Sequence, residues 1–284
     1  MLTMTTEIEG TNQAQEAQRV MPEAKRFAGD PILITGGTGG MGAAMARRFA
    51  SSGARVAIVD LAPDAVTRVA ADLRQEGHEI IGVAADTTDE DSMQAAVAAT
   101  VQSFGSLRGL VTAAGVRQTA ASFDQLSLAT WQNIFDVNVT GTFVAIRAAA
   151  AALIESRGSI VTVSSVTALG ARMNQSAYAT SKAAVLNLTR QIALELSSKG
   201  VRVNCLCPGV TSTPMIEQAI RTDGPNLLVE KLQGSLEQFR PGIPLGRLAE
   251  AEEQAIAAEF LLSSDSSFIT GAGLPVDGGV SMLG

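Results

Sequence analysis

Short apolar segments alternate with longer helical segments from residue 31 to the end of the sequence. The apolar segments, which we predict as strands, are residues 32–35, 55–59, 79–84, 107–112, 159–164, 201–207 and 273–276. The predicted helices cover residues 41–52, 64–76, 89–104, 126–152, 176–199, 213–222 and 248–263. Strand–helix alternation predicts a parallel sheet with helices on both faces. Because crossovers of this kind are right-handed, we expect an α/β fold with a single doubly wound, Rossmann-type sheet.

The domain organisation follows from the same pattern. No linker or internal repeat divides residues 29–284, so we predict one domain. Residues 1–28 are polar, mixed in charge and without the apolar segment of a signal peptide, which predicts a flexible N-terminal extension. Residues 211–247 interrupt the alternation with several prolines and glycines. A long insertion after a strand is typical of a lid, and we expect this one to cover a binding site.

The composition of the chain disfavours several classes of function. The net charge of -7 disfavours binding to nucleic acid or to an anionic membrane surface, and no apolar segment free of charges and turns is long enough to span a bilayer.

Cys205 and Cys207 would face one side of a strand, and the single histidine, His78, is far away in the sequence. We therefore predict buried cysteines and no metal site. Without a disulfide framework, the cytoplasm is the expected compartment.

A glycine-rich turn joins the first predicted strand to the first predicted helix, with the spacing Gly36-x-x-x-Gly40-x-Gly42. Glycines allow a tight turn there and let backbone N–H groups approach a pyrophosphate, while the helix that follows points its positive end at the same anion. The strand before and the helix after make a dinucleotide site a better interpretation than a plain turn. The turn has no Gly-Lys-Ser/Thr sequence, which disfavours a P-loop nucleoside triphosphatase.

The second predicted strand is followed directly by Asp60. A carboxylate at this position can accept hydrogen bonds from both hydroxyls of the adenine ribose and would repel a 2′-phosphate. The glycine-rich turn offers no Arg or Lys after Gly36, so we predict NAD rather than NADP. Asp86 and the small residues Ala113-Ala114-Gly115, which follow the next two predicted strands, are candidate walls of the adenine and ribose pocket.

The only tyrosine, Tyr178, stands four residues before Lys182. On a helix, these two side chains would lie on one face, one turn apart. A tyrosine with its ordinary pKa of about 10 is a poor base at neutral pH, and a nearby cation favours the phenolate and lowers that pKa. The pair is therefore a candidate proton-transfer device.

These motifs together resemble the short-chain dehydrogenase/reductase family. The match rests on the order and spacing of Thr35-Gly36-x-x-x-Gly40-x-Gly42, Ala113-Ala114-Gly115, Asn138, Ser165, Tyr178-x-x-x-Lys182 and Cys207-Pro208-Gly209. The resemblance covers roughly residues 30–284. It implies a Rossmann-type fold, a nicotinamide cofactor and the oxidation or reduction of an alcohol or ketone.

The resemblance also implies a role for each catalytic residue. Tyr178 would be the acid/base, and Lys182 would lower its pKa and bind the nicotinamide ribose. Ser165 would hold the reacting oxygen; the spacing of thirteen residues before Tyr178 selects it over the adjacent Ser164. Asn138 would hold a helix kink and a water of the proton relay.

The cofactor residues implied by the resemblance begin in the glycine-rich turn and end in the segment after Cys207, where the Thr211 backbone and the Thr213 hydroxyl would bind the nicotinamide carboxamide. The full set is Gly36, Thr38, Gly39, Gly40, Met41, Gly42, Asp60, Leu61, Asp86, Thr87, Ala113, Ala114, Gly115, Tyr178, Lys182, Pro208, Gly209, Thr211 and Thr213.

Within the family, residues 234–246 and 276–284 are most similar to the 2,3-dihydro-2,3-dihydroxybenzoate dehydrogenases of catechol-siderophore synthesis. Arg172, six residues before Tyr178, matches an arginine that those enzymes carry between the catalytic serine and tyrosine. A guanidinium there could grip a substrate carboxylate by a bidentate pair. A solvated loop charge is the alternative interpretation of Arg172.

Two departures from that group border the expected substrate site. Gln175 stands where those enzymes tend to have methionine, and Arg117 next to Gln118 shifts the register of an arginine by one residue. We therefore predict Arg172, Gln175 and Gln118 as substrate residues and leave the ring substituents open. Dihydro-3-hydroxyanthranilate or another cyclic alcohol is an alternative substrate.

The resulting hypothesis is an NAD-dependent oxidation of a ring secondary alcohol on a carboxylated dihydroxycyclohexadiene, giving a ketone that aromatises. A reductase of keto-acyl thioesters or small ketones is one alternative, and a non-catalytic NAD-binding sensor is another. The family usually forms tetramers through the helices that correspond to residues 126–152 and 176–199. The resemblance therefore implies a homo-oligomer, with a tetramer favoured.

Overall fold

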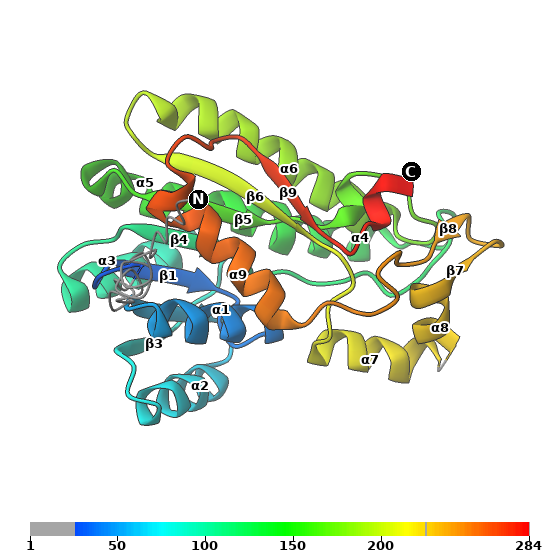
Figure 1. Cartoon of the computed structure of the whole chain (residues 1–284), viewed down its shortest axis with the longest axis horizontal. Helices are drawn as coiled ribbons and strands as arrows, with labels where there is room; N and C mark the ends of the chain where they lie inside the picture. Colours follow the sequence, from blue (N-terminus) through cyan, green and yellow to red (C-terminus); the bar gives the residue numbers. More distant parts are fainter. Residues whose placement is uncertain (1–25, 225, 284) are drawn as a thin grey trace, which may run out of the picture.

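A parallel β-sheet forms the centre of the protein (Figure 1). The computed structural model describes residues 26–224 and 226–283. The 7-stranded sheet has the order β3-β2-β1-β4-β5-β6-β9, and every neighbouring pair is parallel. The strands are β1 (Pro31–Thr35), β2 (Arg55–Asp60), β3 (Ile80–Ala84), β4 (Gly109–Thr112), β5 (Ser159–Val163), β6 (Arg202–Pro208) and β9 (Gly273–Val276). This confirms the predicted doubly wound α/β fold.

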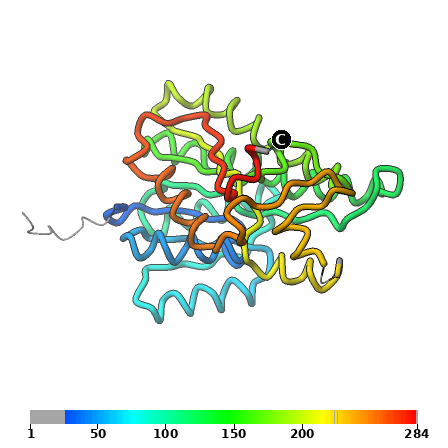
Figure 2. The backbone as a smooth tube through the Cα atoms, turned by 45° about the vertical axis from the view of Figure 1, so that its right-hand side comes forward, coloured from blue at the N-terminus to red at the C-terminus, as the bar shows by residue number. Residues whose placement is uncertain are grey.

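Helices cover both faces of the sheet (Figure 2). One apolar core includes α1 (Gly40–Ser51), α2 (Pro63–Gln75) and α9 (Ala251–Leu262). The other includes α3 (Glu90–Phe104), α5 (Gly141–Ser156) and α6 (Ser176–Ser197). Because successive strand residues face opposite sides, Ile34 of β1 belongs to the first core and Leu33 to the second. Both central strands β1 and β5 are buried at every residue, and burial on both faces explains why they are mainly apolar.

The helix predicted over residues 126–152 is interrupted. It consists of α4 (Leu128–Phe135), a π-helical turn η1 (Asp136–Thr140) and α5. Asn138 lies in the π-turn and is fully buried. A π-turn holds one residue more than an α-turn, and such turns are frequent at functional sites. The prediction of one continuous helix was wrong here, because the interruption depends on contacts that Asn138 makes with a distant loop.

Leu128–Ser156 is long enough to cross a bilayer, and an 18-residue window within it has a mean hydropathy of 1.6. Core helices of globular proteins meet the same criterion. In α5, the side chains of Ala145, Ala149 and Leu153 are fully buried in the core beside the sheet. Length and apolarity are therefore weak evidence for a membrane span in this case.

Residues 211–247 form a separate group of elements beyond the carboxyl ends of the strands (Figure 1). They contain α7 (Pro214–Asp223), α8 (Asn226–Gln233) and a small hairpin of β7 (Gly234–Ser235) and β8 (Arg240–Pro241). The helix predicted over 213–222 corresponds to α7, which begins with proline at its first turn, where the missing N–H costs nothing. The sequence analysis did not predict α8 and the hairpin, because the prolines and glycines that flank α8 and lie in the hairpin resemble a loop.

The predicted N-terminal extension ended at residue 28, and most of it, residues 1–25, lies outside the described part of the chain. The last residues of that segment pack on the domain. Phe27 is buried with its ring edge-on to Phe49 at 5.5 Å, and Arg26 forms an ion pair with Glu259 of α9 at 3.0 Å. The predicted boundary is therefore too late, because an aromatic side chain at residue 27 completes the core.

Candidate active site

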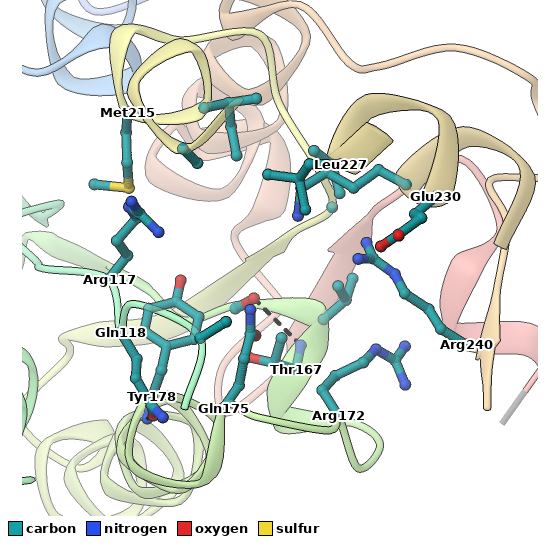
Figure 3. Close-up of a pocket in the computed structure, with 18 of the residues that line it drawn as sticks. Arg117, Gln118, Thr167, Arg172, Gln175, Tyr178, Met215, Leu227, Glu230 and Arg240 are labelled. Carbon is teal, nitrogen blue, oxygen red and sulfur yellow. Dashed lines mark hydrogen bonds between the residues drawn. The ribbon is translucent and has the colours of Figure 1, made fainter. Parts of the chain in front are cut away.

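A cavity of about 450 Å³ lies between the carboxyl ends of β4, β5 and β6 and the lid elements (Figure 3). The segments after these strands supply one wall, which includes Gln118, Ser165 and Pro208. The lid supplies the facing wall, with residues such as Leu227 and Arg240. Ligands of open α/β sheets bind at this edge of the sheet, so the cavity is the candidate active site.

Tyr178 and Ser165 lie side by side in the cavity. Tyr178 belongs to the first turn of α6, and Ser165 follows β5 as the residue that caps a short 3-10 helix, η2 (Val166–Ala168). Burial raises the pKa of Tyr178 above its ordinary value, while a hydrogen bond with Ser165 acts in the opposite direction. The adjacent Ser164 donates a hydrogen bond to the backbone oxygen of Lys182 at 2.6 Å. The structure therefore places Ser165, and not Ser164, beside the tyrosine.

Lys182 lies one helical turn after Tyr178, with its Nζ 5.8 Å from the centre of the tyrosine ring. The ammonium donates a hydrogen bond to the backbone oxygen of Val163 at 3.0 Å. Lys182 is only 5% exposed, and burial lowers its pKa to about 8. The expected lowering of the Tyr178 pKa by this lysine is not found: burial raises the pKa of the phenol, and the hydrogen bond with Ser165 is the effect that opposes it.

Asn138 ties the π-turn to the loop after β4. Its Oδ1 accepts a hydrogen bond from the Val116 backbone N–H at 2.8 Å, and its Nδ2 donates to the Val116 backbone oxygen and to Ser181 Oγ. These bonds explain the kink that the resemblance implies for this residue. They also engage both side-chain atoms within the protein, so a relay water at Asn138 stays a prediction.

Gln118, predicted as a substrate residue, holds the start of α6. Its Oε1 accepts hydrogen bonds from the backbone N–H groups of Ala177 at 3.0 Å and Tyr178 at 3.1 Å. Its Nε2 donates to the backbone oxygen of Asn174 at 3.0 Å. The side chain lines the cavity but is only 2% exposed, and its amide is already engaged. The structure therefore gives Gln118 a positioning role that the sequence alone did not suggest.

The glycine-rich turn forms a cradle that fits a dinucleotide. Gly36 has a positive φ of 66°, and a Cβ there would lie 2.6 Å from the backbone nitrogen of Ala114. The turn and the segment after β4 are thus packed as closely as backbone allows. Gly39 precedes α1 and supplies no side-chain cap. No side chain at the N-cap position therefore competes for the first N–H groups of α1. A pyrophosphate site requires such N–H groups at the start of a helix.

Asp60 ends β2 beside this turn. Its Oδ2 accepts hydrogen bonds from the backbone N–H of Thr38 at 3.1 Å and from the Thr38 hydroxyl, while its Oδ1 accepts from the Leu61 N–H at 2.8 Å. These bonds fix the carboxylate at the position where a ribose would bind, and a carboxylate oxygen can accept more than one hydrogen bond.

The other predicted cofactor residues border the same edge of the sheet. Asp86 follows β3 and accepts hydrogen bonds from the backbone and hydroxyl of Thr88 through one oxygen, Oδ1. The rest lie in the segments that follow the carboxyl ends of strands, including the first residues of α1: Gly40, Met41, Gly42, Thr87, Ala113, Ala114, Gly115, Pro208, Gly209, Thr211 and Thr213. The donor set and the glycine cradle therefore fit a nicotinamide dinucleotide.

Arg172 and Gln175 both line the cavity. Arg172 donates from Nη1 to the neighbouring Ala171 backbone oxygen at 2.8 Å. Its Nη2 is buried without a hydrogen-bond partner among the described residues. Gln175 is the residue before α6, and its side chain makes no capping bond to that helix.

Arg240 and Glu230 are cavity residues that the sequence analysis missed. Arg240 lies in β8 and Glu230 in α8, and both side chains enter from the lid (Figure 3). The available signal was the position of Arg240 within residues 234–246, the lid segment that carried the resemblance. Arg117, which also lines the cavity, donates a hydrogen bond to Thr222 of α7 at 2.9 Å. This bond links the loop after β4 to the lid.

Comparison with known families agrees with this geometry. The family profile described as enoyl-(acyl carrier protein) reductase, which belongs to the short-chain dehydrogenases, matches residues 36–281. The chain is a short-chain dehydrogenase/reductase. The matched range includes the glycine cradle, Ser165, Tyr178 and the lid. The similarity of this short-chain dehydrogenase/reductase to its family therefore extends over the whole candidate active site and is not limited to the dinucleotide fold.

Several curated relatives are similar to this short-chain dehydrogenase/reductase over nearly their full length. A 2-(S)-hydroxypropyl-CoM dehydrogenase of Xanthobacter autotrophicus is 40% identical, covering 92% of this chain and 100% of the relative. A cis-4-hydroxycyclohexanecarboxylate dehydrogenase of Sinomonas cyclohexanicum is 38% identical, covering 90% and 98%. A 2,5-dichloro-2,5-cyclohexadiene-1,4-diol dehydrogenase of Sphingobium indicum is 37% identical, covering 91% and 99%.

Solved structures agree in the arrangement of the fold. Levodione reductase superposes with a TM-score of 0.82 at 31% identity, covering 89% of this chain and 98% of its own. A 3-ketoacyl-(acyl-carrier-protein) reductase from Brucella melitensis, complexed with NADH, superposes with a TM-score of 0.79 at 33% identity, covering 90% and 99%.

The arrangement of this short-chain dehydrogenase/reductase suits proton transfer at an alcohol oxygen. Tyr178 is held by Gln118 through the backbone and by Ser165 through the hydroxyl. An oxygen placed between the two hydroxyl groups could exchange a proton with Tyr178 while Ser165 donates a hydrogen bond to it.

Proposed function

We propose that this protein is an NAD-dependent dehydrogenase that oxidises a secondary alcohol on a carboxylated ring. The observation that carries the proposal is that Arg172 faces the same cavity as Tyr178 and Ser165 and has a buried N–H without a partner in the described part of the chain. A proton-transfer pair and a guanidinium in one cavity of about 450 Å³ suit a small alcohol that carries an anionic group.

In the proposed reaction, Tyr178 removes the hydroxyl proton of the substrate, and Ser165 donates a hydrogen bond to the same oxygen as charge develops there. A bound nicotinamide dinucleotide supplies the acceptor for the hydride that leaves the carbinol carbon. The residues of the glycine cradle, Asp60 and Lys182 would hold it. Where the ring is a dihydroxycyclohexadiene, the ketone product tautomerises to a phenol, which favours oxidation.

The names of two relatives support a ring alcohol, since one is a cyclohexadienediol dehydrogenase and the other a hydroxycyclohexanecarboxylate dehydrogenase. We infer a carboxylated ring alcohol of this kind as the substrate class. A 2,3-dihydro-2,3-dihydroxybenzoate-type diol and its amino-substituted relative, dihydro-3-hydroxyanthranilate, are the members that the lid sequence favours.

A second candidate is reduction of a keto-acyl thioester or a small ketone. The description of the family profile and the Brucella melitensis relative favour it. The Asp60 carboxylate at the ribose end of the cradle disfavours a 2′-phosphate and so argues against an NADPH-dependent reductase. It does not argue against an NADH-dependent one, and the Brucella melitensis relative was solved with NADH.

The test is a turnover screen with NAD and with NADP. The panel contains dihydroxy- and amino-hydroxy-cyclohexadiene carboxylates, cis-4-hydroxycyclohexanecarboxylate, and each ring alcohol as its neutral carboxamide. We expect NAD-linked oxidation of at least one carboxylate, faster than that of its carboxamide. Faster reduction of a keto-acyl thioester with NADPH would replace the proposal with the second candidate. Tight NAD binding without turnover across the panel would instead indicate a non-catalytic sensor.

We also propose that the protein forms a homo-oligomer. Phe143 of α5 is 42% exposed and Leu194 of α6 is 75% exposed, although both are large apolar side chains. Pairing of these helices with a second copy would bury both side chains. Sedimentation analysis of the protein, expected to show a tetramer, tests this proposal, and a monomer at micromolar concentration would exclude it.

A further inference from the structure

We infer that the lid residue Arg240 and the loop residue Arg172 together bind the anionic group of the substrate, which makes Arg240 a determinant of specificity. This inference rests on the proposed function for the identity of the substrate, but not for the presence of an anion site. The first observation is the charge of the cavity. Its described lining has four cationic side chains (Arg117, Arg172, Lys231 and Arg240) and one carboxylate (Glu230), in a chain whose net charge is -7.

The second observation concerns unsatisfied donors. Nη2 of Arg172 and Nε of Arg240 are buried, and neither has a hydrogen-bond partner among the described residues. Buried polar atoms nearly always have a partner, and a charged donor without one is especially unfavourable. Two such donors on two arginines of one cavity indicate a missing acceptor that both can reach. An oxyanion supplies that acceptor.

The two arginines come from opposite walls. Arg172 lies on the loop between Ser165 and Tyr178, whereas Arg240 is fixed in the lid by pairing of β8 with Ser235 of β7. Figure 3 shows their guanidinium groups on the same side of the cavity, away from Arg117. Burial lowers the pKa of Arg240, the neighbouring Arg172 charge lowers it further, and Glu230 acts in the opposite direction. An anion between the arginines would relieve this repulsion and would connect the lid to the catalytic loop.

The charges also indicate which anion fits. Glu230 offsets one of the two guanidinium charges, so this end of the cavity has room for one further negative charge. Nε of Arg240 bonds to none of residues 26–224 and 226–283, and the Nε edge of its guanidinium matches the two oxygens of a carboxylate. We therefore infer a monoanionic carboxylate rather than the dianion of a phosphate monoester.

The experiment measures binding directly and does not depend on turnover. Cyclohexanecarboxylate, cyclohexanecarboxamide and cyclohexyl phosphate are titrated into the full-length protein with saturating NAD, by calorimetry. We expect the carboxylate to bind most tightly. The variant Arg240→Gln should weaken carboxylate binding roughly 10- to 100-fold and leave carboxamide binding unchanged. Arg240→Lys should recover part of the loss. The control Arg221→Gln removes an exposed charge of the same lid outside the cavity and should have no effect.

The outcomes separate this inference from the proposed function. Equal binding of carboxylate and carboxamide by the wild-type protein, or unchanged carboxylate binding in Arg240→Gln, overturns the anion site. Preference for the phosphate overturns the assignment to a monoanion. Loss of carboxylate binding in Arg240→Gln supports the site even if no ring alcohol is oxidised, and in that case only the proposed function fails. A thermal midpoint of Arg240→Gln at or above that of the wild type excludes a merely structural role, because the substitution removes a buried charge beside Arg172.

Discussion

The side-chain oxygen of Gln118 accepts a hydrogen bond from the backbone N–H of Tyr178 at 3.1 Å. The same oxygen accepts from Ala177, so one amide from the loop after β4 satisfies two N–H groups at the start of α6. The position of the candidate acid/base therefore depends on a residue 60 positions earlier in the chain.

Substitution of Gln118 tests this dependence. Gln118→Ala should lower the free energy of unfolding by about 1–3 kcal/mol, because it leaves two buried N–H groups without an acceptor. It should also lower kcat with little change in the dissociation constant for NAD. Urea unfolding and NAD titration measure the two effects. Gln132→Ala, at an exposed position of α4, is the control and should change neither. Full turnover in Gln118→Ala would show that Tyr178 is held by other contacts.

The two adjacent serines should respond differently to substitution. Ser165→Ala and Tyr178→Phe should each reduce turnover by about 10²- to 10⁴-fold while NAD binding is retained, because both hydroxyl groups act on the reacting oxygen. Ser164→Ala should instead lower stability and keep most of the turnover, because its hydroxyl bonds to the backbone of α6. Steady-state kinetics with a common ring alcohol distinguishes the three variants. Near-normal turnover in Tyr178→Phe would exclude the proposed acid/base.

The pKa of Lys182 predicts a dependence of stability on pH. Burial lowers this pKa from 10.5 to about 8 in the folded protein, so below pH 8 the folded state carries a buried ammonium that the unfolded state holds in water. The shift corresponds to a penalty on the order of 3 kcal/mol. The penalty is fully present below pH 8 and is lost as the pH rises from 8 through 10.5.

The variant Lys182→Met removes this penalty together with the hydrogen bond to Val163. We expect it to be more stable than the wild type by about 1–2 kcal/mol at pH 7 and to be inactive. The difference should shrink between pH 8 and pH 10, as measured by chemical denaturation across that range. If the difference in stability between Lys182→Met and the wild type does not change with pH, burial does not lower the pKa of Lys182 in the folded protein.

Asp60 predicts the choice between the two nicotinamide dinucleotides. Asp60→Asn keeps an oxygen that can accept the hydrogen bonds of Thr38 but removes the charge that would repel a 2′-phosphate. We expect the ratio of kcat/KM for NADP to that for NAD to rise by roughly tenfold. Asp64→Asn makes the same charge change at an exposed position in the first turn of α2 and should leave the ratio unchanged.

The sequence predicted those features that depend on local patterns. The strands were found because both faces of the sheet are covered, so that segments such as β1 and β5 are buried throughout and mainly apolar. Cys205 and Cys207 were predicted to be buried, and both are fully buried in β6. The glycine-rich turn and the Tyr178–Lys182 pair were recognisable because their spacing is fixed by one turn and one helix.

The features that were missed depend on contacts between distant segments. The π-turn requires the bonds of Asn138 to Val116, and the role of Gln118 requires a helix 60 residues away. The direction of the Tyr178 pKa is set by burial, which the spacing to Lys182 does not reveal. Arg240 resembled an ordinary lid charge until the fold placed it in the same cavity as Arg172.

The π-turn at Asp136–Thr140 also sets the helical phase of two neighbouring elements. Each residue advances an α-helix by about 100°, so one residue more in this turn rotates α4 by that amount relative to α5. Deletion of a single residue here would restore a regular helix, but it would turn the Trp131–Phe135 stack of α4 to another side and withdraw Asn138 from Val116. Chimeras of this protein with relatives should therefore be joined outside this turn, because a junction within it changes which face each helix presents.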